Sequence, residues 1–151
     1  MKIKVDDLAG GEVVALLDEH LSDMYATSPR ESVHALDLNA LKDPSVTFFS
    51  SWDCEHLAGC IAIKQLTKTS AEIKSMRTVR AYRGQGVASE LLLHTIAFAK
   101  QQGYQHINLE TGTQSYFDAA RRLYKKHGFI DSQPFADYKH DPNSCFMTRS
   151  L

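Results

Sequence analysis

The spacing of hydrophobic residues divides the chain into segments with two different periods. Alternating or continuous apolar runs predict strands, and these cover residues 2–5, 46–51, 57–65, 71–79, 106–109, 129–133 and 145–150. Steps of three and four residues predict helices, and these cover residues 13–27, 36–41, 86–102 and 116–127, the first ending before Ser28 because Pro29 follows it. Ser115, with Asp118 three residues later, predicts a capped start for the last helix.

The order of these segments indicates the fold class. Three consecutive strands with short connections favour an antiparallel meander. Alternation of strand and helix follows, so we expect a mixed α/β sheet with helices on both faces. Nothing in the chain reads as an interdomain linker, and residues 1–151 are therefore predicted to form a single domain.

Composition excludes several functional classes. The formal net charge is −1, so no global basic field argues for nucleic-acid binding. The three cysteines show no CxxC spacing and no pair of histidines shows HExxH spacing, so neither a disulfide framework nor a metal site is expected. No stretch approaches the ~18 apolar residues of a membrane span. We expect a cytoplasmic protein.

The segment most informative about chemistry is the loop over residues 76–88, between a strand and a long helix. Gly84 and Gly86 allow the backbone to turn tightly and to approach a ligand closely. The first turn of a helix leaves amide groups without partners, and these groups attract phosphates. Three arginines lie in the loop, and no acidic residue lies between Glu72 and Glu90. This pattern predicts an anion-binding site, although exposed arginines on a plain turn would give the same sequence.

A dinucleotide-binding oxidoreductase is an alternative. Gly84-x-Gly86 opens a helix after a strand, and Glu110 ends the next strand, where a ribose-binding acid would lie. However, Ser89 occupies the position of the third glycine, and the preceding strands read as antiparallel. A P-loop is excluded because the loop lacks a Gly-Lys-Ser/Thr sequence.

Three segments together resemble the GNAT N-acetyltransferases. Residues 83–88, Arg-Gly-Gln-Gly-Val-Ala, match the Arg/Gln-x-x-Gly-x-Gly/Ala signature of that superfamily. Residues 72–78 resemble the strand before this loop, and residues 123–129 resemble the later Leu-Tyr-x-x-x-Gly-Phe segment. With matching spacing, the resemblance covers about residues 46–135. Residues 28–36 and 135–138 further resemble the small bacterial YsnE-like members.

The resemblance implies one GNAT-like domain with a mixed, mostly antiparallel twisted sheet. About seven strands would be flanked by about four helices, with a splayed central strand pair. It also implies acetyl-coenzyme A (acetyl-CoA) as acyl-donor cosubstrate, and no metal. The residues expected to bind this cosubstrate are Met76, Arg77, Thr78, Arg83, Gly84, Gln85, Gly86, Val87, Ala88 and Ser89. Many members carry an Asn where this chain has Phe117, which puts one pantetheine contact in doubt.

Direct transfer to an amine requires a group that accepts a proton from the amine, because an amine like that of lysine has a pKa near ~10.4 and is protonated at neutral pH. It also requires a group that donates a proton to the departing thiolate, because a thiol has a pKa near ~8.5. By the resemblance, Tyr124 is the candidate acid. Glu72 is the candidate base or water-orienting group, and backbone amides near Thr78 would stabilise the oxyanion. A core tyrosine and a solvated strand carboxylate are the plain structural interpretations of the same two residues.

The expected acceptor is a primary amine of a small molecule or peptide. Glu31, Ser32 and His34 are candidates for the acceptor pocket, although a plain surface loop explains them equally well. A non-catalytic acyl-CoA-binding or sensing module is a further functional alternative. The sequence does not determine the oligomeric state and leaves a homodimer open.

Overall fold

A computed structural model of the chain describes residues 1–34 and 37–151. The helices are α1 (Gly11–Thr27), α2 (Leu38–Leu41), α3 (Val87–Gln101) and α4 (Asp118–Lys126). The strands are β1 (Lys2–Val5), β2 (Val46–Asp53), β3 (His56–Gln65), β4 (Ser70–Thr78), β5 (His106–Gly112), β6 (Ile130–Asp131) and β7 (Ser144–Ser150). The helix predicted over residues 36–41 is found as α2, and its first position lies outside the described residues.

The strands form one seven-stranded sheet in the order β1-β2-β3-β4-β5-β7-β6. Within the described residues only β4 and β5 pair in parallel, and the other five neighbouring pairs are antiparallel. The predicted mixed, mostly antiparallel sheet is therefore confirmed. A dinucleotide-binding domain of the Rossmann type would need a largely parallel sheet, and this sheet does not provide one.

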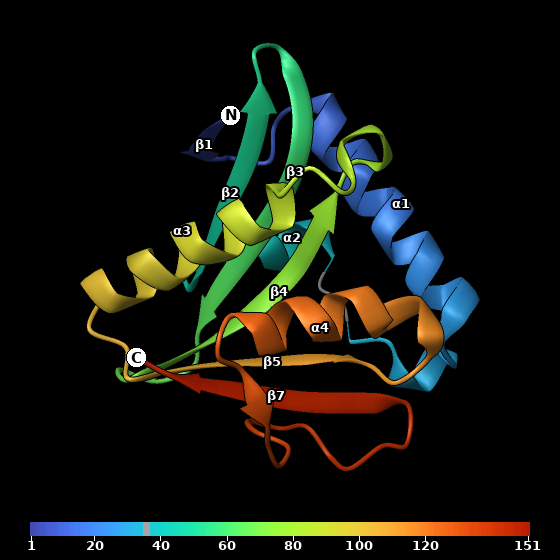
Figure 1. The fold of residues 1–151 in the computed structure, drawn as a ribbon, viewed down its shortest axis with the longest axis vertical. Helices are drawn as coiled ribbons and strands as arrows, with labels where there is room; N and C mark the ends of the chain where they lie inside the picture. The colour runs from blue at the N-terminus through green and yellow to red at the C-terminus, as the bar shows by residue number, and fades with distance from the viewer. Residues whose placement is uncertain (35–36) are drawn as a thin grey trace.

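The two central strands separate along their length. Their pairing runs from Ser70 with His106 to Ile73 with Leu109 and then stops. However, β4 continues to Thr78 and β5 to Gly112. Figure 1 shows the two strands diverging from a common start, with α4 crossing in front of the gap. This is the predicted splayed central pair.

A bulge in β4 accompanies this separation. Ala62 pairs with Lys74, but Cys60 pairs with Arg77, so two residues of β4 lie opposite one residue of β3. Ser75, in the bulge, has a φ of 55°, a left-handed conformation that is uncommon for a residue with a side chain. Bulges increase the local twist and bend a strand. The bulge therefore turns the end of β4 just where β5 leaves it.

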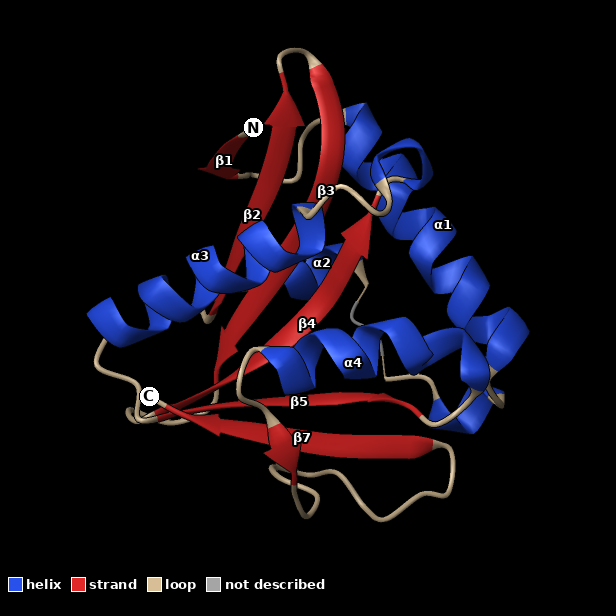
Figure 2. Ribbon diagram, in the orientation of Figure 1, coloured by secondary structure: helices blue, strands red, loops and turns tan. Residues whose placement is uncertain are grey.

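Helices cover both faces of the sheet, as predicted (Figures 1 and 2). One hydrophobic cluster lies under α3 and α4 and includes Ile73, Leu91 and Leu109. A second lies under α1 and α2 and includes Val13 and Leu41. Side chains alternate between the faces of a strand. The polar residues between the apolar ones on β4 and β5 therefore point to the α1 side.

Two local predictions were wrong. Ser115 does not cap α4, because the chain enters that helix through a 3₁₀ turn (Ser115–Phe117) and Phe117 takes the N-cap position without a side-chain hydrogen bond. The strand predicted over residues 129–133 is reduced to β6, and Pro134, which has no amide hydrogen, lies soon after it. In contrast, β5 runs three residues beyond its predicted end and includes Glu110.

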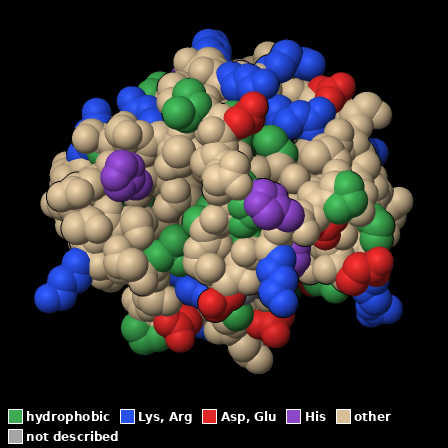
Figure 3. Space-filling view, turned by 90° about the horizontal axis from the view of Figure 1, so that it is seen from below, with side chains coloured by type: hydrophobic (Ala, Val, Ile, Leu, Met, Phe, Trp, Pro, Cys, Tyr) green, Lys and Arg blue, Asp and Glu red, His purple; other side chains and the backbone are tan. Residues whose placement is uncertain are grey.

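The surface of the protein is mixed in character. Within the described residues, no helix combines the length and apolar character needed to cross a bilayer. On the face shown in Figure 3, basic, acidic and hydrophobic side chains are interspersed, and no kind covers the face as one patch.

Candidate active site

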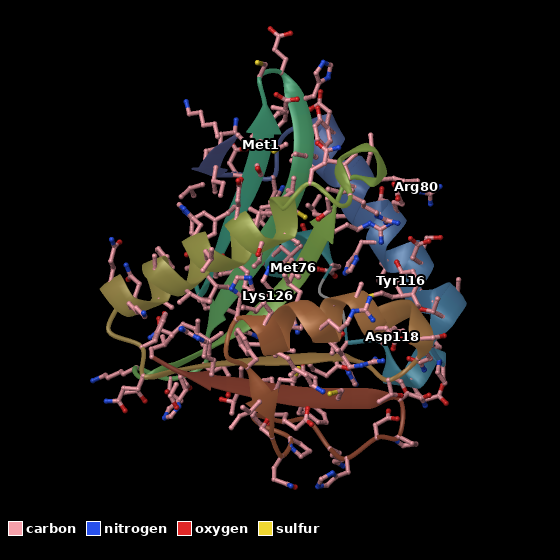
Figure 4. The ribbon with its side chains drawn as sticks, in the orientation of Figure 1. Met1, Met76, Arg80, Tyr116, Asp118 and Lys126 are labelled. Atoms are coloured by element: carbon pink, nitrogen blue, oxygen red, sulfur yellow. The ribbon has the colours of Figure 1, made fainter. Side chains whose placement is uncertain are left out.

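A cavity of about 630 Å³ passes through the gap between β4 and β5. On one side it is lined by the start of α3 and by α4, and on the other by residues of α1 and of the chain that follows it. Figure 4 labels Met76 and Lys126 beside the opening between α3 and α4, and Tyr116 at the α1 end. The cavity therefore connects the two faces of the sheet.

The start of α3 has the properties of an anion site. Gly84 and Gly86 have φ angles of 75° and 83°, and a Cβ atom added at either would meet no atom within 4 Å. Gly86 is the N-cap, without a side-chain hydrogen bond, and its carbonyl accepts from the Glu90 amide. The amides of Val87, Ala88 and Ser89 precede that first bond. These unpaired amide donors, together with the positive end of the helix dipole, form a site that suits a diphosphate.

The end of β4 fits an extended chain. Because β5 pairs with β4 only as far as Ile73, residues 74–78 have no strand partner on that edge among the described residues. Met76, Arg77 and Thr78 line the cavity. Unpaired edge groups can bond an amide-containing arm as a neighbouring strand would. The edge of β4 and the start of α3 open into the same cavity. This arrangement fits a pantetheine arm that is continued by a pyrophosphate.

The cavity brings together nine of the ten residues predicted to bind the cosubstrate, and Gln85 is the exception. The Gln85 side chain instead donates to the Ala81 carbonyl, with 3.1 Å between the atoms. Ser89 Oγ lies 2.6 Å from His127 Nε2, which joins the start of α3 to the end of α4. Burial lowers the pKa of His127, and Lys126 and Arg149 lower it further.

Arg77 contributes its backbone to the cavity and its side chain to α1. The buried guanidinium donates to Glu19 Oε1 and to Asp23 Oδ2, each at 2.6 Å, and to the Tyr116 hydroxyl at 3.2 Å. Burial alone would lower the pKa of Arg77, but the hydrogen bonds to Asp23 and Glu19 raise it overall. The hydrogen bond from Arg77 also lowers the pKa of Asp23. This side chain is therefore charged and paired with two carboxylates, although its buried Nε has no hydrogen-bond partner among the described residues.

Glu72 is buried on β4 and belongs to a three-residue hydrogen-bonded group. Its Oε2 accepts from the Tyr138 hydroxyl at 2.7 Å and from Lys74 Nζ at 3.2 Å. Lys74 Nζ also donates to the Tyr138 hydroxyl at 2.9 Å. Burial raises the pKa of Tyr138, and the Glu72 carboxylate raises it further. Two donors thus hold Glu72 Oε2 in place at the cavity wall.

Glu110 lies on β5 just beyond the point of separation, and its side chain is only 9% exposed. Burial raises the pKa of its carboxyl, and Ser144 and His34 beside it partly offset that effect. Neither neighbour makes a normal hydrogen bond. The contact with His34 Nδ1 measures 3.5 Å, and both that nitrogen and the Ser144 hydroxyl are buried without a hydrogen-bond partner. Glu110 is thus a poorly satisfied carboxyl group at the cavity wall.

Tyr124 comes from α4, on the opposite side of the cavity. The residue is 6% exposed, and its ring packs edge-on against Phe129. Burial raises the pKa of its hydroxyl, and the charge of nearby Glu110 raises it further. The phenol therefore keeps its proton at neutral pH. No protein group among the described residues hydrogen-bonds this hydroxyl, which leaves it free for a ligand.

The three residues predicted for the acceptor pocket do not all line the cavity. His34 lines the cavity, whereas Glu31 and Ser32 do not. Glu31 is exposed in a 3₁₀ turn (Arg30–Ser32), and buried Ser32 donates to Asp141 Oδ2 at 2.6 Å. Among the described residues, no group of three His, Cys, Asp or Glu side chains is arranged to hold a metal ion.

Several functional candidates were absent from the sequence prediction: His20, Lys74, Glu110, Tyr116 and Tyr138. Glu110 had been weighed only as a ribose-binding acid. A usable signal exists on the strands, because Glu72, Lys74 and Glu110 alternate with buried apolar residues. No local signal identifies Tyr138, which is 66 residues from the carboxylate that it contacts.

Comparisons with known proteins agree with this arrangement. Residues 13–129 match the acetyltransferase (GNAT) family. The chain is 50% identical over 151 residues to the uncharacterized N-acetyltransferase YsnE of Bacillus subtilis, covering all of both chains.

Two solved structures share the fold. A protein designated an acyl-CoA N-acyltransferase from Klebsiella pneumoniae aligns with a TM-score of 0.84 at 27% identity, over 99% of this chain and 97% of that one. A GNAT acetyltransferase from Elizabethkingia anophelis with acetyl-CoA bound aligns with a TM-score of 0.69 at 18% identity, over 99% and 97%. By sequence and by fold, the chain belongs to the GNAT family of acetyltransferases.

Proposed function

We propose that the chain transfers an acetyl group from acetyl-CoA directly to a primary amine of a small molecule or peptide. One observation carries the proposal: the free start of α3, the unpaired edge of β4, Tyr124 and two buried carboxylates all line a single cavity. A transferase of this kind needs a cosubstrate site and proton-transfer groups that meet at one point.

The cosubstrate supplies an acetyl group already activated as a thioester, so no nucleophilic side chain is required. Amides of Val87, Ala88 and Ser89 would hold the pyrophosphate, and backbone from Met76 to Thr78 would hold the pantetheine arm. Arg83 and Lys126 line the same end of the cavity and suit the phosphates. The bound acetyl-CoA in the Elizabethkingia structure supports this choice of cosubstrate.

The reaction balances with two proton transfers. A bond forms between the acceptor nitrogen and the acetyl carbon, and the carbon–sulfur bond breaks, so the nitrogen loses a proton and the sulfur gains one. We assign Tyr124 as the donor to sulfur, because its hydroxyl is protonated and has no hydrogen-bond partner among the described residues. Backbone amides near Thr78 would stabilise the charge that develops on the carbonyl oxygen.

Two carboxylates compete for the role of base. Glu72 was expected there, but its Oε2 already accepts hydrogen bonds from Lys74 and from Tyr138, so this oxygen is occupied. Burial raises the pKa of Glu110, which makes it the better proton acceptor. We therefore assign Glu110 as the base and Glu72 as the group that orients the acceptor or a water molecule.

The test combines a thiol-release assay with product analysis. The protein is incubated with acetyl-CoA and a panel of primary amines, and N-acetylated products are identified by mass spectrometry. Amine-dependent release of CoA with a matching product supports the transferase. Stabilisation against heat by acetyl-CoA, without release on any amine, would favour the acyl-CoA-sensing alternative.

A further inference from the structure

The acceptor side of the cavity carries an excess of negative charge. Four carboxylates lie on or directly behind its wall: Glu19, Asp23, Glu72 and Glu110. Two permanently charged cations, Lys74 and Arg77, lie among them. His34 adds at most one more positive charge, so the balance among these seven side chains stays negative in either of its protonation states.

Each cation there is already matched. The Arg77 guanidinium bonds two carboxylates at 2.6 Å each. Lys74 Nζ lies 3.2 Å from Glu72, and its side chain is 9% exposed. His20 also lines the cavity, but burial and the nearby Arg77 lower its pKa to about 4, so it is neutral at neutral pH. Among the described residues that line this side of the cavity, each lysine or arginine is therefore already paired with a carboxylate.

In contrast, Glu110 has no lysine or arginine partner among the described residues, and its contact with His34 Nδ1 measures 3.5 Å. Its side chain is 91% buried, and it faces the cavity without a normal hydrogen bond to protein. A buried carboxylate in this state is costly unless a cation or a donor joins it. The bound acceptor can supply that group, because its amine carries N–H donors in either protonation state.

We propose that the acceptor is a small amine without a carboxylate next to its nitrogen, so that the protein prefers a decarboxylated amine over the parent α-amino acid. This inference rests on the proposed transferase function, and one juxtaposition carries it. Glu110 has no lysine or arginine partner among the described residues, whereas Lys74 and Arg77 beside it are already paired with carboxylates. An α-carboxylate is separated from its amine by a single carbon atom. With the amine at Glu110, it would face Glu72 and Glu110 with no free cation to offset the repulsion.

The experiment compares matched acceptors. Values of kcat/KM are measured for phenethylamine, L-phenylalanine and L-phenylalaninamide, and for agmatine and L-arginine, at equal concentrations of unprotonated amine. The amide keeps the bulk of the amino acid and removes its charge. We expect phenethylamine and the amide to exceed phenylalanine by at least about tenfold, which is a lower bound for one like-charge contact near a protein surface. Agmatine should exceed arginine similarly.

Two variants locate the discrimination. Asp23→Asn removes a carboxylate that engages Arg77, and should shrink the preference for amide over acid. Asp18→Asn removes an exposed carboxylate of the same helix and should leave the preference unchanged. Glu110→Gln lowers turnover on every acceptor if Glu110 is the base, so the comparison uses the ratio of kcat/KM for the amide to kcat/KM for the acid. This ratio should also shrink.

Three outcomes overturn the inference. If phenylalanine is acetylated as fast as its amide, the inference is wrong and the transferase function still stands. A ratio that is the same in Asp23→Asn, Glu110→Gln and the parent protein would also overturn it. Acetylation of none of the five probes would overturn it too, and the wider amine panel then decides separately whether the transferase function stands.

Discussion

The Tyr138 hydroxyl donates a 2.7 Å hydrogen bond to Glu72 Oε2, and this contact joins the segment between β6 and β7 to the central strand β4. It lies on the α1 side of the sheet, away from the start of α3. The contact therefore belongs to the acceptor half of the proposed site, and the two halves can be perturbed separately.

Tyr138→Phe should impair use of the acceptor and spare the cosubstrate. The change removes one donor from Glu72 but keeps the ring that packs against Phe135 and Phe146. We expect KM for the amine to rise several-fold, because a hydrogen bond to a charged group contributes about 1.5–3 kcal/mol. The Kd of acetyl-CoA, measured by calorimetry, should stay the same. Equal changes in both constants would contradict the division into halves.

Tyr124→Phe should lower kcat by about 10²-fold, the usual contribution of a positioned general acid, without weakening acetyl-CoA binding. The change removes only the hydroxyl, and the ring keeps its place in the core. Tyr104→Phe is the matched control, because Tyr104 packs at the edge of the same core and does not line the cavity. A kcat for Tyr124→Phe equal to that of this control would rule out the acid role.

Gly86→Glu should abolish acetyl-CoA binding and leave the protein folded. The new side chain would occupy open space in front of the α3 amides and repel phosphates. Gly103→Glu is a matched control at the other end of α3, since both glycines have a φ of 83° and open surroundings. Each variant should lose about 1–2 kcal/mol of stability to backbone strain. In a thermal-shift titration, only Gly86→Glu should fail to respond to acetyl-CoA.

His20 should make folding stability sensitive to mild acid. Its pKa is lowered from 6.5 to about 4, mainly by burial and then by Arg77. Between these two values the unfolded chain binds the proton and the folded chain does not. The contribution of His20 is therefore present above pH 6.5 and is lost as the pH falls toward 4. Partial exposure reduces the effect to the order of 1–2 kcal/mol.

Urea unfolding at pH 7 and pH 5 measures this contribution. Carboxylates with shifted pKa values also change stability with pH, so the comparison is between the parent protein and His20→Gln. The loss of unfolding free energy between the two pH values should be smaller in the variant. Equal losses would show that the imidazole titrates normally in the folded protein.

The sequence predicted the sheet well because its strands and helices are marked by local periodicity. All seven predicted strands and all four helices are present, and the largest boundary errors concern β5, β6 and the start of α4. The error at β5 has a tertiary cause, because β7 pairs with β5 along its whole length and prolongs it to Gly112.

The candidate site likewise has one part that local sequence predicts and one part that it does not. The loop around Gly86 is one continuous segment with its own sequence signature, and its placement in the cavity could be anticipated. In contrast, the acceptor side is assembled from α1, β4, β5 and the segment before β7. His34 and Glu110 meet from positions 76 residues apart, and no periodicity reports such a contact.

Arg77 limits how freely this enzyme could be re-engineered. Its backbone forms part of the edge proposed to hold the cosubstrate, and its guanidinium pairs with Glu19 and Asp23 of α1. Replacing the first helix to change acceptor choice would leave a buried charge unpaired on the strand proposed to hold the pantetheine arm. Acceptor preference is therefore better altered at His34 or at the residues around Tyr138 than by exchanging the helix.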